Sequence, residues 1–190
     1  MGALHLTLAS ASPRRRDLLA RLGVTPDAVQ PADIDETPLK GELPRAYALR
    51  MGEEKAQAIE APGFVLAGDT VVACGRRILP KTEEESEARA CLELLSGRRH
   101  TVLSSVVLRS PDGSTKSRLS ENTVRFKSLS QEEIDAYLAS DEWRGKAGGY
   151  AIQGAAEALI PWMRGSHSSV MGLPLYETRA LLKSAGFPIG

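Results

Sequence analysis

A small-residue turn followed by three arginines is the first group of side chains that could do chemistry. An apolar segment leads into Ser10 and Ser12, and Pro13 then stands where a helix would begin. The first N–H groups of a helix have no partner inside it, so a helix start attracts anions. Arg14 and Arg15 add planar cations that suit phosphate. An ordinary surface helix with a solvated basic end has the same pattern, and the spacing leaves both interpretations open.

Acidic side chains form a second group. Asp69 follows a short apolar run and Gly68, which places it at the mouth of a buried strand, where an unpaired charge is costly. Asp33, Asp35 and Glu36 form an acidic loop. Mg²⁺ is usually held by one or two carboxylates plus substrate phosphates, so one loop residue together with Asp69 would suit it. The alternatives are a turn aspartate and a solvated loop.

Two lysines and a glutamine complete the candidates. Lys55 lies inside a predicted helix and Lys81 follows an apolar pair, and either could neutralise phosphate charge, although most lysines are merely solvated. Gln153 lies in a glycine-rich segment, residues 143–154, that would let the backbone approach a ligand closely. Its amide offers both a donor and an acceptor, as reading a base edge requires. A tight loop between strands is the alternative.

The composition excludes several classes of protein. The 190 residues have a formal net charge of zero, so no bulk field draws the chain to nucleic acid or to a membrane. No apolar run approaches 18 residues, and the first residues lack the order of a signal peptide. Cys74 and Cys91 fit neither a zinc pattern nor a redox pair. We therefore expect a cytoplasmic protein.

Strand-like and helix-like segments alternate along the chain, which predicts an α/β fold. One helix is expected to begin at Pro13. Four more are expected to cover residues 44–59, 83–95, 130–140 and 174–185. The expected strands cover residues 4–8, 64–67, 71–73, 77–79, 101–109, 115–126, 150–153 and 159–163. The turn at residues 111–113 predicts that the two long segments around it pair as a hairpin.

Taken together, the motifs resemble the Maf family of nucleoside triphosphate pyrophosphatases, also described as septum-formation proteins. The resemblance covers essentially the whole chain, residues 1–190, as a single domain. Its motifs are Ser10-x-Ser12-Pro13-Arg14-Arg15, Asp35-Glu36, Glu54-Lys55, Gly68-Asp69-Thr70-Val71-Val72, Lys81, Leu95-Ser96-Gly97 with His100, the segment 146–154, and Gly165-Ser166 with the segment 170–178.

The resemblance implies an inosine triphosphate pyrophosphatase-like fold, with a mixed sheet, flanking helices and an elongated cleft. It also implies a homodimer that needs Mg²⁺ or Mn²⁺ and converts a nucleoside triphosphate to its monophosphate and pyrophosphate. Asp69 resembles the family's proton acceptor, and it and Glu36 are the expected metal ligands. The positions that match the phosphate surroundings are Ser10, Arg14, Arg15, Lys55 and Lys81.

Arg14, Thr70 and Gln153 match positions linked to the choice of base. They resemble the branch of the family that prefers dTTP and UTP. Two alternatives stay open at this point. One is a relative that acts on 7-methyl-GTP, and the other is a nucleotide-binding regulator of septum formation without important catalysis.

Overall fold

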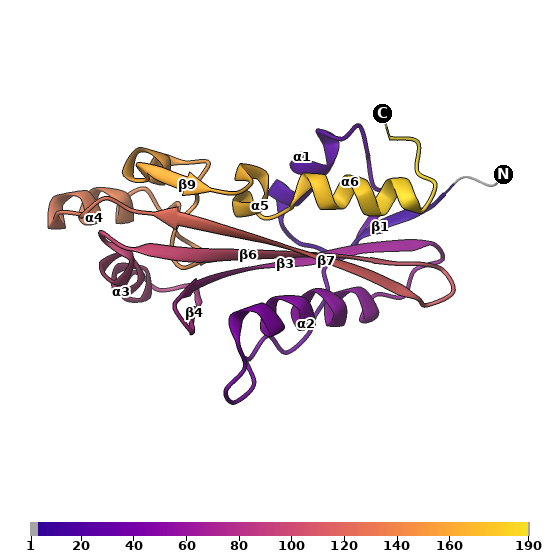
Figure 1. Cartoon of the computed structure of the whole chain (residues 1–190), viewed down its shortest axis with the longest axis horizontal. Helices are drawn as coiled ribbons and strands as arrows, with labels where there is room; N and C mark the ends of the chain where they lie inside the picture. Colours follow the sequence, from indigo (N-terminus) through magenta and orange to yellow (C-terminus); the bar gives the residue numbers. More distant parts are fainter. Residues whose placement is uncertain (1–3, 190) are drawn as a thin grey trace.

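The computed structural model describes residues 4–189, and three long antiparallel strands form its centre (Figure 1). These strands are β3 (Phe64–Cys74), β6 (Arg99–Arg109) and β7 (Thr115–Arg125). The short strands β1 (Leu6–Leu8) and β2 (Ala28–Val29) extend the sheet beyond β3 in parallel, so the sheet is mixed. Its order is β2-β1-β3-β6-β7-β9, with β4 (Arg77–Leu79) on β3 and β9 (Trp162–Arg164) at the far edge. A separate two-stranded sheet joins β5 (Lys81–Thr82) to β8 (Lys146–Ala147).

The helices begin where the local sequence favours a helix start. The α-helices are α1 (Pro13–Ala20), α2 (Pro44–Gln57), α3 (Glu85–Leu95), α4 (Gln131–Leu138), α5 (His167–Met171) and α6 (Leu175–Ser184). Proline occupies the first turn of α1 and of α2, where its missing N–H costs nothing. Ser130 and Glu133 form a capping box at the start of α4. No helix in the part of the chain that is described has the length and apolar character needed to cross a membrane.

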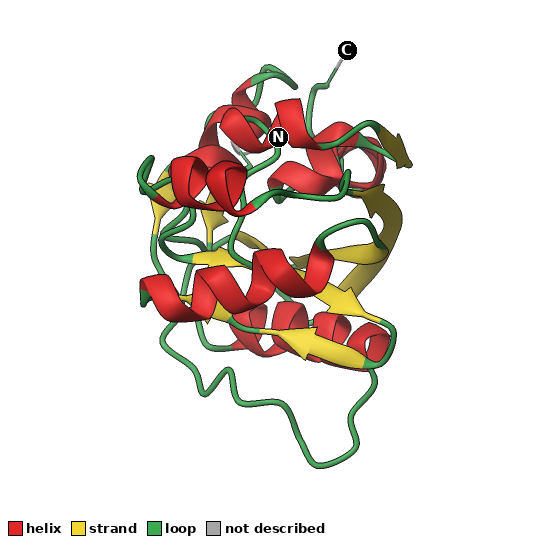
Figure 2. Cartoon of the chain, turned by 90° about the vertical axis from the view of Figure 1, so that its left-hand side faces the viewer, coloured by secondary structure: helices red, strands yellow, loops and turns green. Residues whose placement is uncertain are grey.

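The long strands join two groups of elements that lie at opposite ends of the molecule (Figure 1). At one end, α1 and α6 pack on β1, β3 and β6 around Leu6, Leu66 and Val106. At the other end, α3 and α4 surround a core that includes Phe126 and Trp143. Between the ends, α2 covers the opposite face of the sheet. The loop that precedes α2 extends below this helix and has no regular structure (Figures 1 and 2).

The structure confirms the predicted α/β fold and the hairpin, in which β6 and β7 pair along eleven residues. The expected strand at residues 150–153 is wrong. Gly148 and Gly149 both have φ of 69°, which turns the chain away from the sheet, and residues 152–154 form a further turn. The expected strand at residues 159–163 is reduced to β9, because residues 155–159 form the 3₁₀ helix η1 (Ala155–Leu159).

Asp69 also differs from its expected position. It lies in the middle of β3, opposite Ser105 of β6, and not in a turn at the mouth of a strand. Gly68 allows β3 to lie close to the backbone of β6, since a Cβ atom there would lie 2.3 Å from the carbonyl oxygen of Ser105. Because neighbouring residues of a strand face opposite sides, Asp69 faces α2 while Thr70 faces α5.

Candidate active site

A cleft of about 760 Å³ runs between the two ends of the molecule. One wall comes from the segment between β1 and α1, and the other comes from residues 142–154. Lys55 of α2 and Asp69 of β3 lie between the walls. All ten residues that the sequence indicated as site residues line this one cleft: Ser10, Ser12, Arg14, Arg15, Glu36, Lys55, Asp69, Thr70, Lys81 and Gln153.

A buried ammonium group joins two carboxylates in the cleft. Nζ of Lys55 lies 2.7 Å from Oδ1 of Asp69 and 2.7 Å from Oε1 of Glu36. The side chains of Lys55 and Asp69 are 7% and 4% exposed, so this charge pair is almost dry. Lys81 pairs with the other oxygen of Glu36. Partial burial opposes ionisation of Glu36, but the hydrogen bonds from the two lysines outweigh it and hold the pKa of Glu36 below its ordinary value.

Close packing of α2 on the sheet brings Lys55 to Asp69. A Cβ atom on Gly52 of α2 would lie 2.6 Å from Oγ of Ser105, so only glycine lets the helix lie this close to β6. Lys55 comes three residues after Gly52 and therefore projects from nearly the same face of the helix. The close packing of α2 thus places Lys55 in contact with the carboxylate of Asp69 on β3.

Arg15 ties three segments of the cleft together. Its Nε donates to the carbonyl oxygen of Gly172 at 2.8 Å, and its Nη1 donates to Oγ of Ser10 at 3.2 Å. Its Nη2 donates to Oγ1 of Thr70 at 3.4 Å. The guanidinium group is therefore fixed in place by protein groups, and its charge is presented to the cleft.

Arg14 contrasts with its neighbour. Its buried Nε has no hydrogen-bond partner among residues 4–189. Burial, together with the charge of Arg15, lowers the pKa of Arg14. Ser12 likewise makes no side-chain hydrogen bond to cap α1. A buried donor without a protein acceptor is rare, so Arg14 is a group that a bound anion would satisfy.

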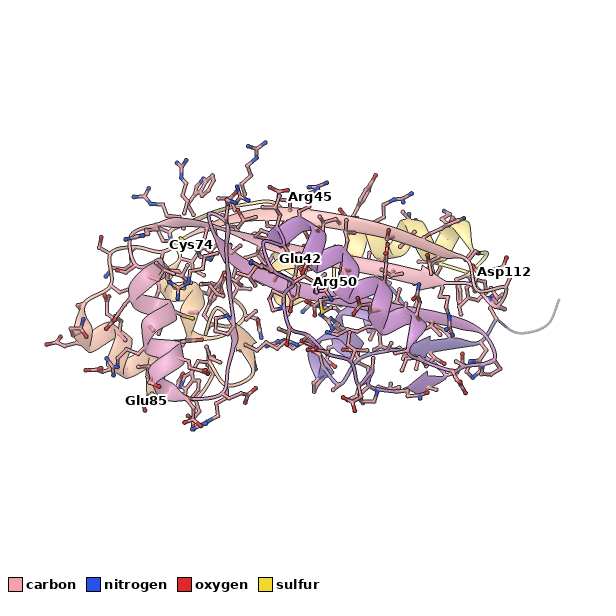
Figure 3. The ribbon with its side chains drawn as sticks, turned by 90° about the horizontal axis from the view of Figure 1, so that it is seen from below. Glu42, Arg45, Arg50, Cys74, Glu85 and Asp112 are labelled. Atoms are coloured by element: carbon pink, nitrogen blue, oxygen red, sulfur yellow. The ribbon has the colours of Figure 1, made fainter. Side chains whose placement is uncertain are left out.

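The loop that carries Glu36 is held by α2. The hydroxyl of Tyr47 donates to the carbonyl oxygen of Glu36 at 2.7 Å. Arg50 forms two 2.7 Å hydrogen bonds to the carboxylate of Glu42 and a third bond to the carbonyl oxygen of Thr37. Arg50 and Glu42 lie side by side in Figure 3. These contacts fix the backbone of the loop around Glu36, which has no regular structure of its own, while Lys55 and Lys81 hold the carboxylate.

The opposite wall is fixed by buried aromatic side chains. The hydroxyl of Tyr150, which lines the cleft, lies 2.8 Å from Nε2 of His100. Burial raises the pKa of Tyr150 and lowers the pKa of His100 to about 4, so both are neutral at pH 7. The hydroxyl of Tyr137 accepts a 3.0 Å hydrogen bond from the N–H of Ala151. The chain is thereby held as it leads to Gln153, whose side chain is exposed in the cleft.

The donor set fits a divalent cation that is shared with a substrate. Among residues 4–189, no group of three or more histidine, cysteine or acidic side chains is arranged to hold a metal ion by itself. Two carboxylates do converge, however, because Glu36 and Asp69 contact the same ammonium of Lys55. One or two carboxylates plus substrate phosphates are the usual Mg²⁺ ligands. Glu36 and Asp69 therefore suit a metal that arrives with a phosphate ligand.

Residues 5–185 match the family described as Maf-like protein. The chain belongs to the Maf family. A relative from Novosphingobium aromaticivorans is 62% identical over 97% of this chain and 94% of its own length. A relative from Zymomonas mobilis is 61% identical over 98% of this chain and 94% of its own length. Both are named dTTP/UTP pyrophosphatase.

The fold of this Maf-family chain is also found in a distant protein. A HAM1 protein from Coxiella burnetii superposes with a TM-score of 0.53 at 17% identity, over 96% of this chain and all of that one. At this identity the likeness concerns the fold alone. It agrees with the inosine triphosphate pyrophosphatase-like architecture that the motifs implied.

Sequence reasoning missed several residues of this Maf site. Tyr47 and Arg50 were not singled out, because a helix pattern does not reveal which loop its polar residues will contact. Glu142 also lines the cleft, and its position directly before the glycine-rich segment 143–154 is the available signal. Lys146, the first residue of the motif 146–154, lines the cleft as well.

Proposed function

We propose that this chain hydrolyses dTTP and UTP to the nucleoside monophosphate and pyrophosphate. The observation that carries the proposal is the buried contact of Lys55 with Asp69 and Glu36 in a cleft that also presents Arg14 and Arg15. Cleavage of a triphosphate needs cations for the phosphates and a base for water, and this arrangement supplies both. The names of relatives near 60% identity support the choice of substrates.

In this proposal, Asp69 is the proton acceptor. Oδ1 accepts a hydrogen bond from Lys55, which leaves Oδ2 to take a proton from the water that attacks the α-phosphorus. The bond between that phosphorus and the α–β bridging oxygen breaks, and pyrophosphate leaves. Lys55, Lys81 and Arg15 offset the charge that develops on the phosphate oxygens. Asp69 thus acts from a fixed position, because Lys55 restrains its carboxylate.

We assign the metal position to Glu36 and Asp69. A bound Mg²⁺ or Mn²⁺ would supply additional positive charge for the phosphates. The chain's own contribution is to keep Glu36 ionised, since its two lysine partners hold its pKa low. Ser10, Ser12 and Arg14 would bind phosphate oxygens near the start of α1.

We assign the base to the end of the cleft that Gln153 lines. An amide can meet the O4 acceptor and the N3–H donor of uracil or thymine. We place Thr70 beside the phosphates, because its hydroxyl lies next to Arg15.

A nucleotide panel with resolved products tests the proposal. The expected products are UMP or dTMP plus pyrophosphate, and EDTA is expected to stop turnover until Mg²⁺ or Mn²⁺ is restored. Release of diphosphate with orthophosphate would contradict the reaction type. Higher kcat/KM for 7-methyl-GTP than for both pyrimidines would assign the chain to the other branch, and tight binding without turnover would favour a regulator.

We also infer a cytoplasmic homodimer that binds neither nucleic acid nor membrane. The neutral net charge supports the absence of nucleic-acid binding. Light scattering of the purified protein over a range of concentrations tests the dimer. A monomer at all concentrations would contradict it.

A further inference from the structure

Glu142 lines the same cleft as Gln153 and contacts the two residues that follow it, Gly154 and Ala155. Its Oε2 accepts a 2.8 Å hydrogen bond from the N–H of Ala155, the first residue of η1. Gly154 makes room for this contact, because a Cβ atom there would lie 2.0 Å from Oε2. The carboxylate is therefore packed against the Gly154–Ala155 peptide, one residue beyond Gln153.

The other carboxylate oxygen is available to a ligand. Glu142 lines the cleft, and its Oε1 has no hydrogen-bond partner among residues 4–189. The ammonium of Lys146, which also lines the cleft, donates to the carbonyl oxygen of Arg144 at 2.8 Å. A free acceptor thus lies on the wall of the cleft that also carries Gln153.

Gln153 alone does not select uracil over cytosine. Uracil and thymine present O4 as an acceptor and N3–H as a donor, whereas cytosine presents a 4-amino donor and N3 as an acceptor. A glutamine amide carries a donor and an acceptor and satisfies either pattern after rotation by half a turn. An ionised carboxylate only accepts, so it discriminates where the amide does not.

We propose that Glu142 is a specificity-determining residue that accepts the N3–H of uracil or thymine and rejects the N3 lone pair of cytosine. This inference rests on the proposed function and deepens it. In the pyrimidine complex, Glu142 would accept the N3–H, so that Gln153 needs only to donate to O4. Guanine also has a ring N–H, so Glu142 separates uracil from cytosine, and the size of the cleft must separate pyrimidines from purines.

The test is the ratio of kcat/KM for UTP to kcat/KM for CTP in the wild type and in Glu142→Gln. The variant keeps an oxygen for the N–H of Ala155 and gains an NH₂ donor on the base side. We expect the ratio to fall on the order of 10- to 100-fold, the effect of one charge-assisted hydrogen bond. The matched control is Glu157→Gln, an exposed side chain on η1 that does not line the cleft, and its ratio should stay at the wild-type value.

A second measurement needs no variant. The wild type should turn over 3-methyl-UTP at least about tenfold less efficiently than UTP, because a methyl group replaces the hydrogen that Glu142 accepts. An equal fall for UTP, dTTP and CTP in Glu142→Gln would show that Glu142 only caps η1 and would overturn the inference. So would efficient turnover of 3-methyl-UTP. A wild type inactive on both UTP and dTTP would instead overturn the proposed function, and this inference with it.

Discussion

Lys55 and Asp69 form a nearly dry ion pair, with Nζ 2.7 Å from Oδ1, between an α-helix and the central strand of the sheet. Taking two charges out of water is expensive, and a buried pair is retained only where further hydrogen bonds satisfy it. Glu36 supplies such a bond to Lys55. The pair therefore depends on the loop that carries Glu36 as well as on the helix and the sheet.

Asp69→Asn should abolish most of the activity and leave the fold intact. The change is nearly isosteric and removes the proposed proton acceptor, and loss of a general base typically costs about 10²- to 10⁴-fold in rate. Glu36 still pairs with Lys55 in the variant, so the ammonium is not left without a counter-charge. Pyrophosphate release measures the loss of activity, and circular dichroism checks that the fold is retained. The matched control is Asp112→Asn, in the exposed turn between β6 and β7 (Figure 3). Near wild-type turnover of Asp69→Asn would refute the role of Asp69 as a base.

Arg14→Ala and Arg15→Ala should fail in different ways. Arg15 makes three hydrogen bonds to the protein, so its loss should lower the free energy of unfolding by about 1–3 kcal/mol as well as the activity. The Nε of Arg14 has no protein partner, so its loss should mainly raise KM and change stability by less than about 0.5 kcal/mol. Steady-state kinetics and urea titration measure these effects, with exposed Arg16→Ala as the control. Equal destabilisation by both changes would contradict the contrast.

Tyr47→Phe should weaken the response to metal without unfolding the protein. The lost hydroxyl holds the backbone at Glu36, and one hydrogen bond is worth about 0.5–1.5 kcal/mol. The Mg²⁺ concentration for half-maximal turnover of UTP should therefore rise by roughly 2- to 12-fold, while kcat at saturating Mg²⁺ changes less. Tyr176 of α6 is 82% exposed, and Tyr176→Phe should leave the titration unchanged. An unaltered Mg²⁺ titration for Tyr47→Phe would show that the loop is positioned without this bond.

His100 should make the protein less stable in mild acid. Burial lowers the pKa of His100 to about 4, whereas an unfolded histidine titrates near 6.5. Between these values the unfolded state binds more protons, so the free energy of unfolding rises with pH across this window. The contribution approaches about 1.4 kcal/mol per pH unit. Urea titrations at several values between pH 4.5 and 7 give the free energy of unfolding at each pH. This free energy should rise less steeply with pH in His100→Gln than in the wild type, and an equally steep rise would contradict the assignment.

Elements with a local signal were predictable from the sequence. Pro13 and Pro44 begin helices, and the turn at residues 111–113 joins β6 to β7, because each signal acts within a few residues. The site residues were predictable as a set because they are charged or polar at unusual places. Their gathering in one cleft is a consequence of the strand order, which no local pattern contains.

Contacts between distant segments were not predictable. The glycine at position 68 suggested a turn, although its purpose is close approach to Ser105, 37 residues further along the chain. The residues after Gly149 have the apolar character of a strand, but two successive left-handed glycines direct them to the wall of the cleft. Likewise, the partner of Tyr47 is a backbone carbonyl, which carries no side-chain signature.

Three strands of eleven residues each run without interruption from one end of the molecule to the other. At about 3.3 Å per residue, each strand is about 36 Å long, and the elements on both sides of the cleft pack on these same strands. The three strands therefore connect the two ends of the molecule continuously. Moving these two ends toward each other would bend or twist the sheet, and we expect its backbone hydrogen bonds to oppose such a movement. We therefore expect Lys55 and Asp69, which are packed on these strands, to keep their spacing when a nucleotide binds, and we expect the surrounding loops to adapt to different bases.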